Sequence, residues 1–190
     1  AALPAAGRTP VHAAAYAGSL AALKLLLAAD PGAVELEDTD GLSPLHLAVM
    51  NGHAEAARAL GRAGAAVGAR DRGGRTPALA AAFAGQLGCV EALAELKANV
   101  TTPDAGGRTP LHAACFNGHA EAASRLVALG ADPGAADAEG RTPLHAAAFG
   151  GHTAVAQALL SAGAALGAAD GGGRTPLHSA ALNGQAETLE

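Results

Sequence analysis

One short phrase recurs along this chain of 190 residues: a glycine, a variable residue, and then Thr-Pro-Leu-His or a close variant of it. The six copies begin at Gly7, Gly41, Gly74, Gly107, Gly140 and Gly173. Successive copies begin about 33 residues apart, and only the first interval is longer, by a single residue. A constant period of this size indicates stacked units, each too small to bury its own apolar face without its neighbours. The sequence therefore predicts one elongated array over residues 1–190.

The period divides the array into five full units and one partial unit. The units span about residues 7–40, 41–73, 74–106, 107–139, 140–172 and 173–190. The chain starts just before a Thr-Pro and stops within the second half of a unit, so we expect a piece of a longer array. The third unit has Leu79 in the histidine position and Lys97 in place of a helix-capping glycine. We therefore expect the third unit to make the loosest joint in the stack.

The fourth unit shows how each repeat is expected to fold. Thr109 is a suitable N-cap and Pro110 suits the first position of a helix, so a first helix of about two turns is predicted. Gly118 interrupts that helix. A second helix is predicted over residues 119–129, with Gly130 as its left-handed C-cap. Turn-forming residues then lead into the next Thr-Pro.

Each unit opens with Thr-Pro-Leu-His or a close variant and is predicted to contain a helix, a glycine, a second helix and a double turn, about every 33 residues. This pattern resembles the ankyrin-repeat family. The resemblance covers residues 7–190. It implies an all-α solenoid of stacked helix-turn-helix units with projecting β-hairpin-like fingers. It also implies that the fingers and the first helices line a concave face, where a partner binds.

The resemblance implies a non-catalytic module that binds another protein or a peptide, with no cofactor and no small-molecule substrate. An alternative is that the array is the targeting or regulatory arm of a larger enzyme, ligase or channel. The resemblance further implies a structural, hydrogen-bonding role for the histidines that close the repeated phrase. These are His12, His46, His112, His145 and His178.

Composition and motifs argue against other functions. The net charge of −5 opposes binding to nucleic acids or anionic membranes, which require a basic surface. No run of 18 or more large apolar residues is present, so no membrane span is expected. All eight histidines fall on repeat positions, and equivalent histidines lie a full unit apart, too far to share a zinc ion. No nucleophile elbow or phosphate loop is found, so we predict no catalytic or metal-binding residues.

Cysteine usage bears on the compartment. Cys89 and Cys115 are the only cysteines, too few for a disulfide framework. We expect reduced, buried thiols in a cytoplasmic protein, with a nuclear location also open. The two cysteines fall in neighbouring units, so a bridge between them stays open at this point.

All four aromatic residues of the chain share one register of the repeat, two positions before the glycine between the helices. The register holds Tyr16, Met50, Phe83, Phe116, Phe149 and Leu182. Leu111 and Phe116 are five residues apart, about 140° around a helix. If Leu111 points into the stack, Phe116 points toward the fingers. We predict that this row contacts a partner; the alternative is that its side chains fill the seams between first helices.

Arginines form a second row just before the Thr-Pro of most units. They are Arg8, Arg75, Arg108, Arg141 and Arg174, with Leu42 interrupting the row. The last four each follow an aspartate by four residues. One interpretation makes Arg75, Arg108 and Arg141 a cationic rim for an acidic partner. The other makes each arginine an ion-pair partner inside its own finger, with little effect on stability.

Overall fold

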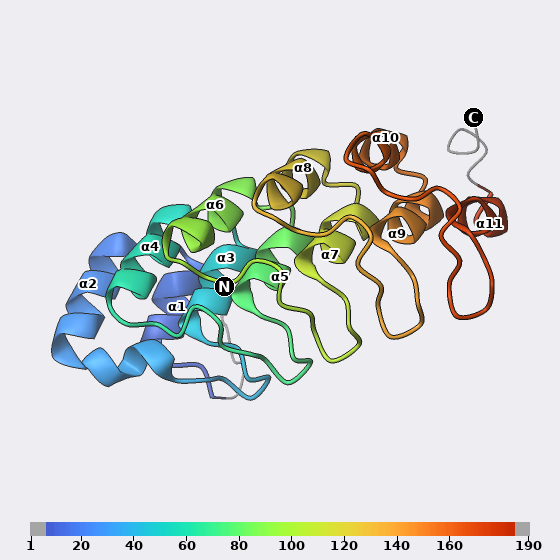
Figure 1. Ribbon diagram of the computed structural model, residues 1–190. Coiled ribbons are helices and arrows are strands. Elements are labelled where there is room, and N and C mark those ends of the chain that lie inside the picture. The colour runs from blue at the N-terminus through green and yellow to red at the C-terminus, as the bar shows by residue number, and fades with distance from the viewer. Residues whose placement is uncertain (1–6, 185–190) are drawn as a thin grey trace.

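A computed structural model describes residues 7–184 of the chain as an elongated stack of paired helices (Figure 1). The first helices of the units are α1 (Pro10–Tyr16), α3 (Pro44–Met50), α5 (Pro77–Phe83), α7 (Pro110–Phe116), α9 (Pro143–Gly150) and α11 (Pro176–Leu182). The second helices are α2 (Leu20–Ala29), α4 (Ala54–Arg62), α6 (Leu87–Glu95), α8 (Ala120–Ala128) and α10 (Thr153–Ser161). A 3₁₀ helix, η1 (Pro31–Glu35), follows α2.

First and second helices form two layers, and the turn segments that precede each Thr-Pro project together from one side of the stack (Figure 1). We call these segments fingers and number each by the unit whose Thr-Pro it precedes. Residues 7–184 contain no assigned strand, so the fingers are hairpin-like turns without a sheet. The all-α solenoid predicted from the repeat is confirmed. The second helix expected in the sixth unit lies outside the described residues.

Each first helix begins at a cap built by the repeated phrase. In the fourth unit the Thr109 hydroxyl accepts the backbone N–H of His112 at 3.4 Å, and Nδ1 of His112 accepts the backbone N–H of Thr109 at 3.2 Å. Pro110 occupies the first helical position, where no N–H is needed. This reciprocal capping satisfies donors that a helix N-terminus otherwise leaves unpaired.

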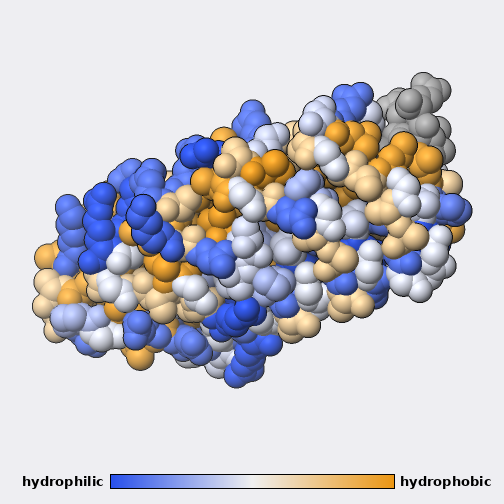
Figure 2. All heavy atoms as spheres, in the orientation of Figure 1, coloured by the Kyte–Doolittle hydropathy of each residue, from blue (hydrophilic) through white to orange (hydrophobic). Residues whose placement is uncertain are grey.

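The core is a thin layer of leucine and alanine. Leu45, Leu60, Leu93, Leu111 and Leu126 are completely buried between the two helix layers. Burial of each leucine stabilises the fold by about 1.5–3 kcal/mol. Alanines fill most remaining core positions, which lets the backbones of neighbouring helices approach closely. So thin a core leaves some apolar surface in contact with solvent, and Figure 2 shows such side chains gathered over the second helices toward the C-terminal end.

Both cysteines are buried and free. Burial raises the pKa of the Cys89 thiol to about 11 and that of the Cys115 thiol to about 12. A thiol with so high a pKa is a poor nucleophile and a poor metal ligand near neutral pH. The cysteines therefore belong to the core, and they are not bridged to one another.

Neighbouring fingers are joined by backbone hydrogen bonds that require glycine. The N–H of Ala138 donates to the carbonyl of Gly106 at 2.9 Å. Beside it, Gly107 has φ +77°, and a Cβ at Gly107 would lie 2.9 Å from the Ala138 nitrogen. Only glycine combines this left-handed backbone with so close an approach. The recurring glycine of the phrase is thus explained by stacking between fingers.

Candidate partner-binding groove

A groove of about 480 Å³ crosses α5, α7 and α9 on the side that faces the fingers. Its floor is formed mainly by side chains of the first helices: Leu79, Phe83, Ala113, Phe116, Ala146 and Phe149. Its wall is formed by finger residues: Arg75, Asp104, Arg108, Asp137 and Arg141. The two rows found in the sequence therefore meet in one groove over the third, fourth and fifth units.

The aromatic row is half exposed within this groove. Phe83, Phe116 and Phe149 keep 54, 48 and 44% of their surface exposed. The rings of Phe116 and Phe149 stack with centroids 6.2 Å apart and planes 13° apart. These two rings thus fill part of the seam between α7 and α9 and also present apolar surface to solvent. Seam filling is thus observed for this pair of rings, whereas partner contact by the row stays a prediction.

The other members of that row lie outside the groove. Tyr16, Met50 and Leu182 are exposed at the same register of α1, α3 and α11, at 42, 40 and 70%. None of the three lines the groove. Of the six residues in this row, the groove therefore brings together only the three phenylalanines.

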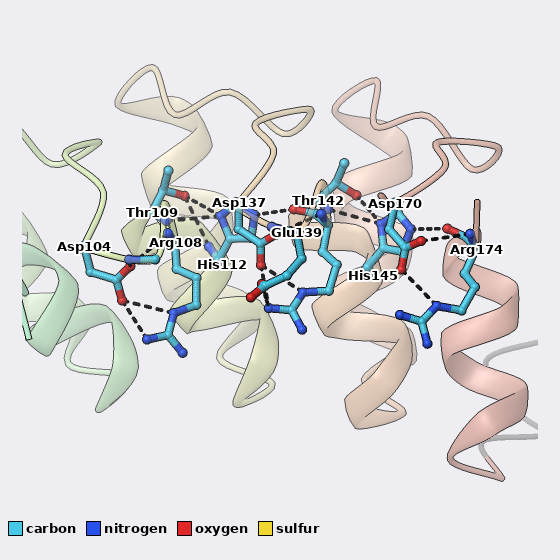
Figure 3. A network of polar contacts seen from close by, with 12 residues as sticks. Asp104, Arg108, Thr109, His112, Asp137, Glu139, Thr142, His145, Asp170 and Arg174 are labelled. Atoms are coloured by element: carbon cyan, nitrogen blue, oxygen red, sulfur yellow. Dashed lines mark hydrogen bonds and ion pairs between the residues drawn. The ribbon is translucent and has the colours of Figure 1, made fainter. Parts of the chain in front are cut away.

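The arginine row is paired inside the fingers. Ion pairs of 2.7–2.8 Å join Arg75 to Asp71, Arg108 to Asp104 and Arg141 to Asp137. Figure 3 shows the pair of Arg108 with Asp104. The aspartate side chains are only 2–3% exposed, whereas the three arginine side chains are 45–59% exposed. Finger-internal pairing is thus observed, and the outer face of each guanidinium remains open to the groove. A role for these arginines in partner contact stays a prediction.

The buried aspartates hold their fingers together. Oδ1 of Asp137 accepts the backbone N–H groups of Glu139 and Arg141 at 3.0 and 2.9 Å, while Oδ2 accepts the Arg141 side chain at 2.9 Å. Burial by itself raises the pKa of Asp137, but the hydrogen bonds and charge of Arg141 outweigh it and lower the pKa below its usual value. Asp137 therefore stays ionised, with both carboxylate oxygens satisfied.

Histidines of the repeated phrase link the fourth unit to the fifth and the fifth unit to the sixth. Nε2 of His112 donates to the carbonyl of Arg141 at 3.0 Å, and Nε2 of His145 donates to the carbonyl of Arg174 at 2.9 Å. Nδ1 of each ring faces the threonine of its own cap (Figure 3). Burial is the main cause that lowers the pKa of His112, which favours the neutral ring. Because both ring nitrogens are occupied, these groove histidines are structural, as the family resemblance implies.

Two features, one in the first fingers and one in the groove floor, were not anticipated from the sequence. Arg8 pairs across units, donating to Asp38 at 3.0 Å, because Leu42 replaces the arginine that would otherwise serve Asp38. The groove floor also includes the residue after the histidine, which is alanine at Ala113 and Ala146 and serine at Ser179 of α11. The absence of Arg at position 42 was visible in the sequence, but the pairing across units needed coordinates.

Other kinds of site are not found in the described part of the chain. Residues 7–184 contain no cluster of three or more His, Cys, Asp or Glu side chains that could hold a metal ion. No helix among these residues has the length and apolar character needed to cross a membrane.

Helix pairs stacked at a period of about 33 residues, with projecting turns on one side, define a helical-repeat solenoid. The family model described as "Ankyrin repeats (3 copies)" matches residues 2–71, 63–137 and 125–190. No curated protein matches the chain. The chain belongs to the ankyrin-repeat family. Ankyrin repeats are generally protein–protein interaction modules, and the family is typically non-catalytic.

Proposed function

We propose that the chain is a non-catalytic interaction module that binds a peptide or a surface segment of another protein in the groove over α5, α7 and α9. The observation that carries the proposal is the half-exposed cluster of Phe83, Phe116 and Phe149 in a groove with arginine side chains on its wall. Clustered exposed apolar side chains in a groove mark interaction sites in soluble proteins.

Magnitudes favour recognition by both the floor and the wall. The three rings are already about half buried, so their remaining burial by a partner contributes about 2–4.5 kcal/mol, whereas association costs about 4–15 kcal/mol. The apolar floor alone thus supports weak binding at best. Hydrogen bonds from the exposed guanidinium groups of the wall supply the further stabilisation and the specificity.

The test replaces Phe83, Phe116 and Phe149 together by alanine and captures partners from a native cell extract. We expect captured protein to be lost while the helical circular dichroism is retained. A matched control replaces three exposed leucines outside the groove, Leu20, Leu25 and Leu160, by alanine, and it should capture as wild type does. Unchanged capture by the phenylalanine variant contradicts the proposal.

A second measurement covers the case in which the triple variant loses structure. A photoreactive benzoylphenylalanine in place of Phe116 keeps an aromatic ring in the groove. Crosslinks from this position to the captured partner support the proposal. Crosslinks obtained only from a benzoylphenylalanine in place of Leu25 on α2 contradict it.

A further inference from the structure

We propose that the groove binds a segment in the polyproline II conformation, whose residues repeat as apolar, acidic and solvent-facing, with one turn on each unit. This inference rests on the proposed function of the groove and names the chemistry of its occupant. It follows from the shape of the groove, from the two alanines in its floor, and from the charges on its wall.

The groove has a floor and a wall of different chemistry. The first helices supply a mainly apolar floor, the fingers supply a wall of arginines paired with aspartates, and the third side is open to solvent. A β-strand presents its side chains in only two directions. A polyproline II helix has three residues per turn and therefore presents three faces, one for each side of this groove.

The spacing of the units matches the same conformation. Packed helices lie about 8–10 Å apart. One polyproline II turn rises about 9 Å, from three residues at about 3.1 Å each. Every third side chain of the segment therefore meets an equivalent position on the next unit. Three turns bring three apolar side chains against α5, α7 and α9.

Ala113, which is 8% exposed, and Ala146 line the floor with small side chains, so the groove has room above them for a bulky apolar side chain. The same register is occupied by Leu47 in the second unit, where the leucine is 3% exposed and fills the space itself. Leu47 does not line the groove, whereas Ala113 and Ala146 do. The rings of Phe116 and Phe149 stand one helical turn further along α7 and α9. A leucine-sized side chain seated over either alanine would also contact these rings.

On the wall, exposed arginine side chains are paired with buried aspartates. Asp71 and Asp104 are 2% exposed and their carboxylates accept backbone N–H groups as well as the arginines. The remaining guanidinium donors of Arg75 and Arg108 face outward. The third finger is the most basic of the three, since residues 68–75 hold three arginines against one aspartate, a net +2. In the fifth finger Arg141 also pairs with Glu139. The acidic positions of the segment therefore lie against Arg75 and Arg108.

The probes are capped 12-residue peptides of the unit Leu-Glu-Pro repeated four times, with Leu-Pro-Glu repeats to sample the opposite chain direction. Companion peptides carry Gln or Lys in place of Glu, or Ser in place of Leu. Binding to the full chain is measured by fluorescence anisotropy. We expect one Glu order to bind, the Gln peptide to bind about tenfold more weakly, and the Lys and Ser peptides weakest. Added salt should weaken the Glu peptide alone.

Two protein variants test the floor. Replacing Ala113 and Ala146 by leucine fills the groove with the side chain that the second unit already accommodates at that register, so the fold should persist. We expect at least a tenfold loss of affinity for the Glu peptide. Replacing Ala13, the exposed equivalent in α1 outside the groove, by leucine should leave affinity unchanged.

Three results would overturn the inference: equal binding of the Glu and Lys peptides, unchanged binding by the filled variant, or no binding of any peptide in the panel. The proposed function is judged separately. If wild type captures a partner through Phe116 crosslinks and no panel peptide binds, the groove is a binding site and the chemistry inferred for its occupant is wrong.

Discussion

The joint between the third and fourth units differs from the joint between the fourth and fifth in its hydrogen bonds. In the latter, His112 donates to the Arg141 carbonyl at 3.0 Å and the finger bond from Ala138 measures 2.9 Å. In the former, Leu79 replaces the histidine, and the finger bond from Ala105 to the Gly73 carbonyl measures 3.4 Å. The helices nevertheless stack in the same way at both joints (Figure 1).

The weaker joint has one compensating contact of its own, made by Arg70. Nη1 of Arg70 donates to the carbonyls of Gly74 and Pro103 at 2.9 Å each, and so bridges the third and fourth fingers. The Arg108 carbonyl, which lacks a histidine donor, still accepts the backbone N–H of Asp104 at 2.9 Å. The comparison indicates that helix packing and glycine turns set the stacking geometry, while the histidine bonds adjust its strength. That the third unit makes the loosest joint stays a prediction.

The largest expected effect breaks the stronger joint at its finger. Gly107→Ala forces a left-handed alanine and places its Cβ 2.9 Å from the Ala138 nitrogen, so we expect a loss of about 3 kcal/mol in the free energy of unfolding. Gly173 has a similar φ of +75°, but a Cβ added there would meet no atom of another residue within 4 Å, its chain neighbours aside. Gly173→Ala should therefore cost only about 1 kcal/mol. Urea denaturation of both variants measures the difference; equal losses would contradict the role of the finger contact.

The next-largest effect is expected when the residue at the histidine position of one joint is replaced by that of the other. His112→Leu removes the donor to Arg141 and leaves the backbone N–H of Thr109 without its acceptor, so we expect a loss of about 2 kcal/mol. The reciprocal Leu79→His should gain about 1 kcal/mol if the new ring reaches the Arg108 carbonyl. Hydrogen exchange of α7 and α9 localises the change. A neutral His112→Leu would mean that the histidine bonds add nothing to the stronger joint.

Acidification should weaken the joints at which His46 and His112 bond to the next unit. Burial is the main cause that lowers the pKa of His46 and His112 from the usual 6.5, so the unfolded chain takes up protons at these residues before the folded chain does. Their contribution is fully present above pH 6.5 and decreases below it, by at most about 1.4 kcal/mol per pH unit for each histidine. Unfolding free energies between pH 7 and 5 check this. His112→Leu should flatten the slope, and an identical slope would argue against the assignment.

The smallest expected effect concerns Lys97, in the third unit, on one side of the weaker joint. Lys97 adopts φ +63° where the equivalent residues Gly64, Gly130 and Gly163 are glycines with φ between +92° and +100°. Lys97→Gly should relieve the strain and raise stability by about 0.5–1 kcal/mol, after the entropy of the unfolded glycine is subtracted. Thermal unfolding measures the gain. Lys97→Ala keeps the strained backbone and should show no such gain; an equal gain in both would point to the charge instead.

Much of this structure could be predicted from sequence because the same capping and turn residues recur in several units. Thr109 and Pro110 fixed the start of α7, and Gly130 ends its unit's second helix with φ +95°, as expected. The extra residue near Pro31 was visible, but its folding into the 3₁₀ helix η1 was not. Of the site, sequence located the two rows. It could not show that only three of the six large side chains share one groove, because the groove depends on small residues such as Ala113 packed across units.

The links between units have a short range. The side chains of His112, Asn117 and Arg70 each form a hydrogen bond with an adjacent unit. None of these three hydrogen bonds reaches a unit beyond the adjacent one. A substitution in one groove position therefore perturbs its immediate neighbours and little beyond them, so changes two units apart should combine additively. In an array built in this way, evolution or design can change the recognition surface one unit at a time, without compensating substitutions in the other units.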